Sequence, residues 1–455
     1  MSAPSASDRY HALDALRGFA MFLGVLLHAA LSYTFIPVPF WPVQDPRRSN
    51  IFDGVLLAVH DFRLQLFFLL AGFFGCLLTT RYGFGGTAKH RLKRVALPLV
   101  LAMLTIQPAL QAVSVYALAT ANGSRSRLTF FGDSVAPSET PLKAVAEHFT
   151  SGTFLQALIP AHLWFLWFLL LCFALMLPLA WLGDRLRSHT LGNAWDAGFR
   201  RLARSPFRWL ILAALTWPLL LPMTSPAGVD TPLSWVPQVH LLAYYFFFFL
   251  IGWNLYRHRD VLERFVRGWP WAMAVGNLLV LPLGILALYL EMKPHKADVE
   301  DGFVFHLLAL AFLGLYTWLC IGGLIGLFLH FLSRERAWVR WMADSSYWCY
   351  LASLPPIVLF QFLALPWEIP GPLKFAFVSL ATIAVLLLTY RYGVRYTFIG
   401  RLLNGPRGEL VRKRQEPGAP TDREHGSVRH RKNSPQRRKG HKEIKRPRVG
   451  PDEPD

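Results

Sequence analysis

The sequence is poor in charged residues, and acidic residues are the scarcer kind. Only 16% of its 455 residues are charged, with 28 Asp and Glu against 47 Lys and Arg, whereas 53% are hydrophobic. The mean hydropathy of +0.33 is too high for a soluble chain of this length. Apolar runs of about twenty residues, the length that crosses a bilayer, recur along most of the chain. The composition therefore excludes a soluble protein and indicates a polytopic membrane protein.

Cysteine is scarce as well. The chain has four, all inside apolar runs and none in a Cys-x-x-Cys pair: Cys76, Cys172, Cys320 and Cys349. Cysteines this far apart in apolar surroundings are typical of small buried residues, not of a disulfide framework or a metal site. We therefore predict no metal site.

Apolar runs are what the sequence has in abundance. The first cannot be a cleaved signal peptide, because it is too long, has no small-residue cleavage pattern and contains Arg17 and His28. We predict an all-α, polytopic integral membrane protein of about ten transmembrane helices. We place them at about 13–36, 53–79, 95–118, 161–182, 208–224, 239–256, 269–290, 303–332, 345–365 and 372–394.

The basic residues are distributed unevenly between the predicted loops. The four loops on the same side as the N-terminus hold more than twice as many Lys and Arg as the five opposite loops. By the positive-inside rule, this asymmetry predicts that both termini lie in the cytoplasm. The expected location is the cell's inner (plasma) membrane, which the chain would cross many times.

The last segment of the chain, 401–455, has a different composition. It contains 16 Lys and Arg against 8 Asp and Glu, with Pro and Gly throughout and almost no apolar residues, so it cannot bury enough surface to fold alone. We predict a transmembrane domain over 1–400 and a disordered basic cytoplasmic tail over 401–455, attracted to the anionic inner leaflet. Nucleic-acid binding is not expected, because the tail lacks interleaved aromatic residues for base stacking.

Two polar residues stand out in the first apolar run. Arg17 and His28 are eleven residues apart. At about 100° and 1.5 Å per residue, their side chains return to within roughly 20° of one helix face, about 16 Å apart along the axis. Charge is costly in hydrocarbon, so the pair indicates a functional polar track shielded by other helices. Asp14, three residues before Arg17, is spaced to pair with it, although an ordinary helix-start carboxylate explains Asp14 equally well.

The second apolar run carries a further polar cluster. His60 and Arg63 are three residues apart and share a helix face, as do Asp61 and Gln65, four residues apart. Four polar groups near one end of a span are typical of a functional site. An alternative is that a set such as Asp61–Arg63 or His60–Asp61 pins two helices together.

Two other segments carry candidate residues. Arg91 and Arg94 precede the third run at a three-residue spacing, where they could clamp phosphate groups at the cytoplasmic mouth. Any cytoplasmic loop collects basic residues, so this signal is weak alone. His162 begins the fourth run, and we expect it at the outer surface at a depth similar to that of His28.

These segments, taken in order, resemble the acyltransferase 3 family of integral membrane acyltransferases, and within it the glucan biosynthesis protein C branch of glucan succinyltransferases. The matching segments are Arg9-Tyr10, Leu13-Asp14-Ala15-Leu16-Arg17, His28, Phe62-Arg63-Leu64-Gln65-Leu66-Phe67-Phe68 with Gly72-Phe73, Arg91-Leu92-Lys93-Arg94-Val95 before Pro98, His162-Leu163-Trp164-Phe165-Leu166, and Tyr347-Trp348-Cys349-Tyr350-Leu351 before Pro355.

The resemblance implies roles for four of these residues. Arg17 and His28 would form the family's Arg-x10-His motif, and Arg91 and Arg94 its Arg-x-x-Arg motif, both associated with acyl-CoA handling and acyl transfer. Two positions depart from the family pattern. Ser353 stands where many members have a His, and Ala71 where many have a Ser.

The activity expected from this resemblance is O-acyl transfer. The donor would be a cytoplasmic acyl-CoA carrying a group such as succinyl or acetyl, and the acceptor a hydroxyl of an extracytoplasmic glucan or other carbohydrate. Acyl-CoA is then a substrate, and no bound cofactor is expected. Arg91 and Arg94 would hold the CoA phosphates, Arg17 the donor, and His28 would be the general base. The supporting and acceptor-side residues would be His60, Asp61, Arg63, His162 and Asp14.

A rival interpretation comes from another class of protein. A transporter of an organic anion or glycan precursor could bind its cargo on the same Arg–His track and relay protons along it. Intramembrane charges alone do not discriminate between the two, because they mark transport pathways as readily as active sites.

Overall fold

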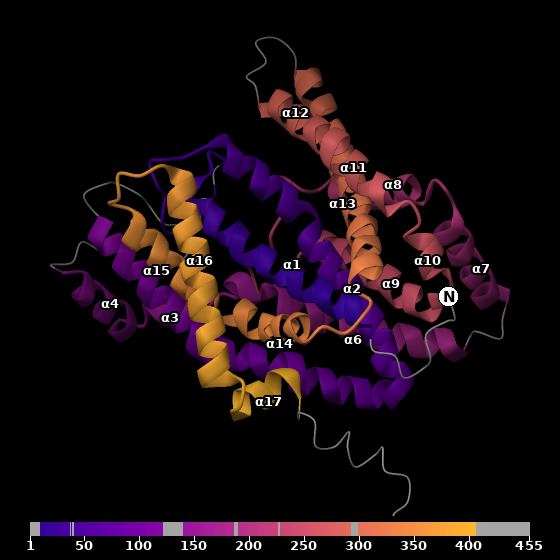
Figure 1. Ribbon diagram of the computed structural model, residues 1–455, viewed down its shortest axis with the longest axis horizontal. Helices are drawn as coiled ribbons and strands as arrows, with labels where there is room; N and C mark the ends of the chain where they lie inside the picture. Colours follow the sequence, from indigo (N-terminus) through magenta and orange to yellow (C-terminus); the bar gives the residue numbers. More distant parts are fainter. Residues whose placement is uncertain are drawn as a thin grey trace, which may run out of the picture. The chain divides into compact units, whose positions relative to one another are not determined.

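The computed structural model describes residues 10–36, 38, 41–121, 140–185, 190–225, 228–292 and 299–405. Helices are the only regular structure over these ranges (Figure 1), which confirms the predicted all-α class. The tail predicted at 401–455 lies outside the described residues from 406 onward. Helix α17 (Phe398–Asn404) crosses the predicted domain boundary at 400.

The helices follow one another with short turns between most of them. The longer ones are α1 (His11–Ala30), α2 (Asn50–Arg91), α3 (Leu97–Ala121), α6 (Trp164–Arg185), α7 (Thr190–Arg204), α8 (Arg208–Leu220), α9 (Val239–Arg257), α12 (Leu281–Met292), α13 (Val299–Phe331), α14 (Ala337–Ala352), α15 (Leu354–Ala364) and α16 (Gly371–Thr389). The shorter ones are α4 (Pro141–Thr150), α5 (Thr153–Gln156), α10 (Leu262–Phe265) and α11 (Trp269–Val275).

The number of membrane-capable helices is lower than the ten predicted. The described residues contain seven helices that are long and apolar enough to cross a membrane, or eight if the bent pair α14–α15 forms one span. The chain is therefore a multi-pass membrane protein, as predicted. Each of the ten predicted spans coincides with helix, and the difference lies in how those helices are joined, shortened or broken.

Two predicted spans, 53–79 and 95–118, belong to one run of helix. This run, Asn50–Thr120, has 71 residues, which is about 106 Å of helix and more than three times the thickness of a bilayer core. It is broken at Gly83, whose φ of 70° is open to glycine but costly for other residues. The cytoplasmic loop predicted here is thus helical, and it continues through the π-helical turn η2 (Leu92–Ala96) into α3.

Two other predicted spans differ in length or shape. The span predicted at 208–224 is the 13-residue helix α8, which at about 20 Å is too short for a bilayer core of about 30 Å. The span predicted at 345–365 is bent by 69° where α14 meets α15. Ser353 lies at this break, directly before Leu354 and two consecutive prolines, which cannot continue the hydrogen bonds of α14.

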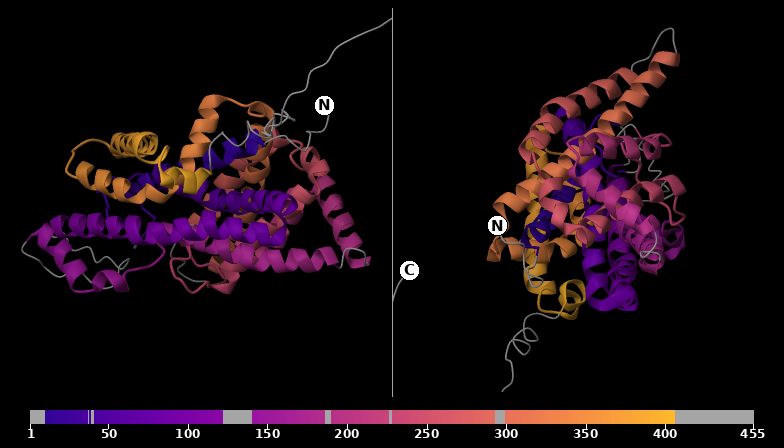
Figure 2. Two further views of the ribbon diagram at one scale, coloured as in Figure 1. Left: turned by 90° about the horizontal axis from the view of Figure 1, so that it is seen from below. Right: turned by 90° about the vertical axis from the view of Figure 1, so that its right-hand side faces the viewer.

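Two glycines allow helices α2 and α9 to pack in close contact. A Cβ on Gly72 of α2 would collide with the carbonyl oxygen of Phe249 in α9, and a Cβ on Gly252 of α9 would collide with the carbonyl oxygen of Leu69. The two helix backbones therefore touch, as small residues permit in membrane bundles. Helix α1 contacts both α2 and α14 (Figure 1), and α12 packs along α13 (Figure 2).

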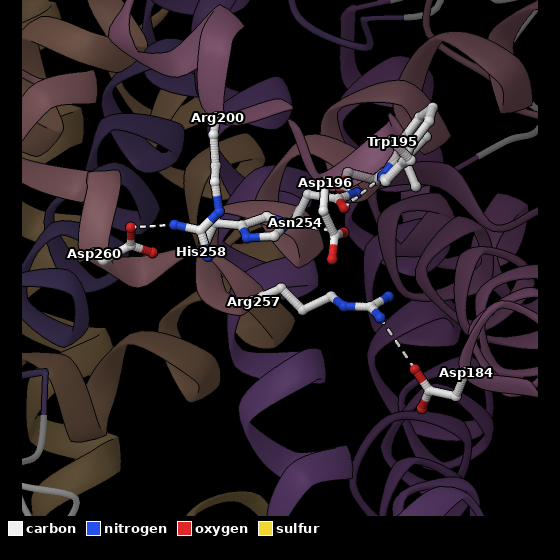
Figure 3. Close-up of polar contacts among 9 residues, drawn as sticks. Asp184, Trp195, Asp196, Arg200, Asn254, Arg257, His258 and Asp260 are labelled. Carbon is white, nitrogen blue, oxygen red and sulfur yellow. Dashed lines mark hydrogen bonds and ion pairs between the residues drawn. The ribbon is translucent and has the colours of Figure 1, made fainter. Parts of the chain in front are cut away.

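A polar cluster joins α7 to the end of α9 and to the turn that follows α9 (Figure 3). Trp195 of α7 donates a hydrogen bond from Nε1 to Asn254 Oδ1 of α9 at 2.9 Å. His258 Nε2 lies 3.2 Å from Asp196 Oδ1, and Arg200 pairs with Asp260. The amphipathic helix α7 is thus held against the end of α9 by side-chain contacts.

Candidate active site

The C-terminal half of α1 opens onto a cavity of about 450 Å³, which we call the histidine cavity. His28 of α1 lines it together with His60 and Arg63 of α2 and with His162 of the short turn η3 (Ala161–Leu163). Side chains from three separate parts of the sequence are thus brought into one cavity. Its polar wall also includes Asp230.

His28 has little polar support of its own. Its Nδ1 is buried and has no hydrogen-bond partner among the described residues. Its ring instead stacks on the indole of Trp41, with ring centroids 5.8 Å apart and planes inclined by 16°. Trp41 is buried and lines the same cavity.

Arg63 lies deep between α1 and α2. The residue is only 8% exposed, and a Cβ at Gly24 would collide with its guanidinium. Glycine at position 24 therefore leaves the guanidinium room against the α1 backbone. Its Nε is buried without a hydrogen-bond partner in the described part of the chain. Such an unsatisfied group requires an explanation, and a bound ligand is one.

His60 and Asp61 point to different sides of α2. His60 Nε2 lies 2.8 Å from the carbonyl oxygen of Val229 and faces the histidine cavity. Asp61 lines a neighbouring cavity of about 110 Å³, and its own carbonyl accepts a hydrogen bond from Thr317 Oγ1 of α13 at 2.7 Å. This contact joins α2 to α13 through the backbone of α2, so it does not involve the carboxylate of Asp61.

His162 is buried within the protein. The turn η3 folds it inward, so that its Nε2 lies 3.0 Å from the carbonyl oxygen of Leu351. The hydroxyl of Tyr350 in turn donates to the carbonyl of His162 at 2.8 Å. His162 is thereby fixed to the end of α14 and reaches the same cavity as His28.

A narrow cavity of about 40 Å³, which we call the neck, leads away from the histidine cavity. Both cavities are lined by His28, Arg63 and His162. The remaining wall of the neck is largely aromatic and apolar, formed by Met21, Val25, Phe67, Phe165 and Tyr350, with Gly24 and Ser353. The ring centroids of Phe67 and Phe165 are 5.6 Å apart.

The neck continues into a third cavity of about 360 Å³, which we call the arginine cavity. Met21, Phe67, Phe165 and Tyr350 line both of them. Three predicted residues, Arg17, Arg91 and Arg94, line the arginine cavity and are thus brought together from α1, α2 and η2. The three cavities are therefore adjacent, with histidines in the first and arginines in the third.

The arginines of this cavity are held by neighbouring side chains. Arg17 Nη2 lies 3.4 Å from Asp14 Oδ1, with 42% of the Arg17 side chain exposed. The guanidinium of Arg91 lies over the ring of Phe173, 4.5 Å from its centroid. These contacts orient the side chains, and like charges gathered in one hollow favour an anionic ligand.

No pattern in the sequence marks several of the residues that line the cavities. Trp41 lies in a loop whose path only the fold defines, and Asn404 reaches the arginine cavity from α17, beyond all predicted spans. The two departures from the family pattern also lie in cavity walls, Ser353 in the neck and Ala71 in the arginine cavity. A short hydroxyl at 353 cannot replace an imidazole as a base near neutral pH.

Comparisons with known proteins agree with this arrangement. The acyltransferase domain family, acyltransferase 3, matches residues 10–391. A glucans biosynthesis protein C from Escherichia coli strain SMS-3-5 / SECEC is 32% identical over 103 residues, which are 22% of this chain and 25% of the relative. The protein of that name from E. coli strain K12 is 31% identical over 103 residues, with the same shares. The match thus spans only about a quarter of these relatives' length. No solved structure matches the chain significantly.

The family match extends over nearly the whole described bundle and includes almost all the residues that line the three connected cavities. The chain therefore belongs to the acyltransferase 3 family, and it is a multi-pass membrane protein.

Proposed function

We propose that the protein is an O-acyltransferase that moves an acyl group, such as succinyl or acetyl, from acyl-CoA to a hydroxyl of a carbohydrate, with a glucan as the first candidate acceptor. The observation that carries this proposal is the row of three cavities that share wall residues. The arginine cavity offers cationic side chains for a large anionic donor, the histidine cavity offers a histidine for a neutral acceptor, and the neck lies between them. The name of the E. coli relatives supports glucan as the acceptor.

On the donor side, the arginine cavity suits the phosphates of CoA. Arg91 and Arg94 would bind them by charge-assisted hydrogen bonds, and Arg17 would direct the donor toward the neck. The thin arm that carries the thioester could enter the neck, whereas the nucleotide end is too large for about 40 Å³ and would stay behind.

On the acceptor side, His28 would act as the general base. As the acceptor oxygen attacks the thioester carbon, a C–O bond forms, the C–S bond breaks, and the hydroxyl proton passes to His28 and then to the leaving CoA thiolate. Arg63, buried beside His28 in the wall of the neck, would stabilise the negative charge on the carbonyl oxygen. Transient acylation of His28 would use the same groups in two steps.

The proposed orientation follows from the distribution of basic residues. With both termini in the cytoplasm of a plasma membrane, the arginine cavity would take its donor from the cytoplasm, and the histidine cavity would face the carbohydrate outside. The basic tail would lie near the anionic inner leaflet. Cysteines introduced at Lys143 and at Arg201, tested with a membrane-impermeant thiol reagent in intact cells, should be labelled and protected, respectively.

The decisive experiment measures transfer directly. Full-length protein purified in detergent is incubated with acyl-CoA radiolabelled in the acyl group and with a soluble glucan, and label on the glucan is counted. His28→Ala and His28→Gln should both lose more than nine-tenths of the turnover, because general-base catalysis contributes about 10²–10⁴-fold. The control is His330→Ala, which removes an exposed histidine at the end of α13. A protein that leaves donor and glucan chemically unchanged would instead support the transporter interpretation.

A further inference from the structure

The loop that follows α1 returns to cover His28. Within it, Trp41 presents its indole to the imidazole, nearly parallel, with the ring centroids 5.8 Å apart. The indole N–H donates a hydrogen bond to Gln361 Oε1 of α15 at 2.9 Å. Trp41 is 6% exposed and Gln361 is 1% exposed, so neither side chain has room to move freely.

The side chain of Gln361 also contacts the backbone of His28. Its Nε2 donates to the carbonyl oxygens of His28 and Ala29, each at 3.1 Å. The amide thus accepts from the indole and donates to the backbone of the residue on which the indole stacks. All three residues hold one another through contacts from α1, the following loop and α15.

These contacts hold the imidazole of His28 in one orientation, which in a catalytic histidine is usually the effect of a hydrogen bond. In many sites a carboxylate or carbonyl on the second ring nitrogen fixes the plane of the imidazole. Here Nδ1 of His28 is buried without such a partner among the described residues. The stacked indole is therefore the contact that restricts rotation of the ring.

We propose that Trp41, locked by Gln361, is a positioning residue that fixes the plane of the His28 ring for proton transfer. This inference rests on the proposed role of His28 as the base. Trp41 does not exchange a proton, and it acts through the angle at which the imidazole meets the acceptor hydroxyl. Small errors in such an angle are costly, because a misplacement of about 1 Å can lower a rate about 100-fold.

The test compares turnover and binding in four variants of the full-length purified protein, with radiolabelled acetyl-CoA and a soluble glucan as probes. Trp41→Ala should lower kcat about 10- to 100-fold and leave both KM values within about twofold. Trp41→Phe keeps an aromatic ring against His28 and should retain most of the kcat. Gln361→Met, which removes all three side-chain hydrogen bonds at similar volume, should give an intermediate kcat. Trp367→Ala is the control, because Trp367 is a half-exposed tryptophan that packs on Phe377 away from His28.

A double variant distinguishes positioning from general loss of structure. If Trp41 acts only through His28, the pair Trp41→Ala and His28→Ala should be no slower than His28→Ala alone. An unchanged kcat in Trp41→Ala overturns the proposal. So does a higher KM for the glucan with unchanged kcat, which would make Trp41 a platform for the sugar. A loss of equal size in Trp367→Ala also overturns it.

A readout without turnover separates this inference from the proposed function. Diethyl pyrocarbonate modifies imidazole nitrogens, and mass spectrometry gives the rate at His28 alone. Trp41→Ala should raise that rate several-fold over wild type, whereas Trp41→Phe and Trp367→Ala should not. If wild type transfers no acyl group, the proposed function fails, and this labelling rate then decides the inference. Equal rates in all four proteins would refute it.

Discussion

Lys374 and Asp45 form an ion pair that is almost completely closed off from solvent. Nζ lies 2.7 Å from Oδ2, and the two side chains are 1% and 2% exposed. The ammonium also donates to the carbonyl of Leu365 at 3.1 Å, and the other carboxylate oxygen accepts from the backbone N–H of Arg47 at 2.8 Å. The pair therefore ties the loop that carries Trp41 to α16.

Removing one member of this pair should destabilise the protein strongly. Lys374→Met leaves the Asp45 carboxylate buried without its counter-charge, at an expected cost of about 3–5 kcal/mol in the free energy of unfolding. The measurement is the Tm of the purified protein in detergent, together with its level in the membrane. The double variant Asp45→Asn with Lys374→Met should recover much of the loss. A Tm for Lys374→Met equal to that of wild type would show that water reaches the carboxylate.

The arginine cavity should control the donor's KM. Arg91→Ala with Arg94→Ala should raise the KM for acyl-CoA by about 100-fold or more, because hydrogen bonds to charged groups contribute about 1.5–3 kcal/mol each. The kcat at saturating donor should change less, since phosphate binding occurs far from the chemistry. Lys93→Ala is the matched control, because Lys93 carries the same charge in the same turn but is exposed. An unchanged KM for acyl-CoA would show that the two arginines do not bind the donor and are only the basic residues that any cytoplasmic loop collects.

The transfer activity should depend on the shape of the Arg17 guanidinium as well as on its charge. A guanidinium makes paired, directional hydrogen bonds that an ammonium cannot copy, so Arg17→Lys should lose most of the transfer activity. Asp14 lies 3.4 Å from the guanidinium, and Asp14→Asn tests whether that contact orients it. Both variants need equal membrane levels, checked by blot. Full activity of Arg17→Lys would contradict directional recognition, and equal losses would make Asp14 part of the site.

The cluster in Figure 3 should lose stability in acid through His258. Burial lowers the pKa of His258, and the nearby Asp196 carboxylate offsets only part of this effect. The folded state thus resists protonation that the unfolded chain accepts below its ordinary pKa of about 6.5. The stabilising contribution is present above that pH and is lost as the pH falls below it. The Tm of His258→Gln should therefore fall less than that of wild type between pH 7.5 and pH 5.5. Parallel curves would exclude His258 as the acid-sensitive group.

Periodicity and charge predict much of the fold. The α1 span and the shared face of Arg17 and His28 follow from apolar run length and from a helix that repeats every 3.6 residues. The break at Gly83 agrees with the sequence, because Gly83, Gly85 and Gly86 lie between two predicted spans, whereas the helix on both sides of the break does not follow from the pattern. The bend at Ser353 depends on two prolines read together with the packing of α14, which sequence spacing does not contain.

The residues of the candidate site are also only partly predictable from the sequence. Polar side chains inside apolar runs are conspicuous, so His28, Arg63 and Arg17 can be found without a structure. The position of His162 at the start of a span does not indicate its partner, because the turn η3 folds its ring against the carbonyl of Leu351. Trp41 and Gln361 meet across 320 positions of sequence. No local pattern predicts such a contact, because it exists only after α15 has packed on α1.

The neck has a consequence for the cell's energy supply. A cavity of about 40 Å³ holds only about three or four water molecules, and rings of Phe67, Phe165 and Tyr350 surround it. In the proposed orientation, the arginine and histidine cavities would lie toward opposite sides of a membrane that carries an electrical potential. The narrow, largely aromatic neck between them would then limit the leak of ions, while it would still have to admit the acyl group. Its narrowness would protect the membrane potential while the enzyme modifies carbohydrate outside the cell.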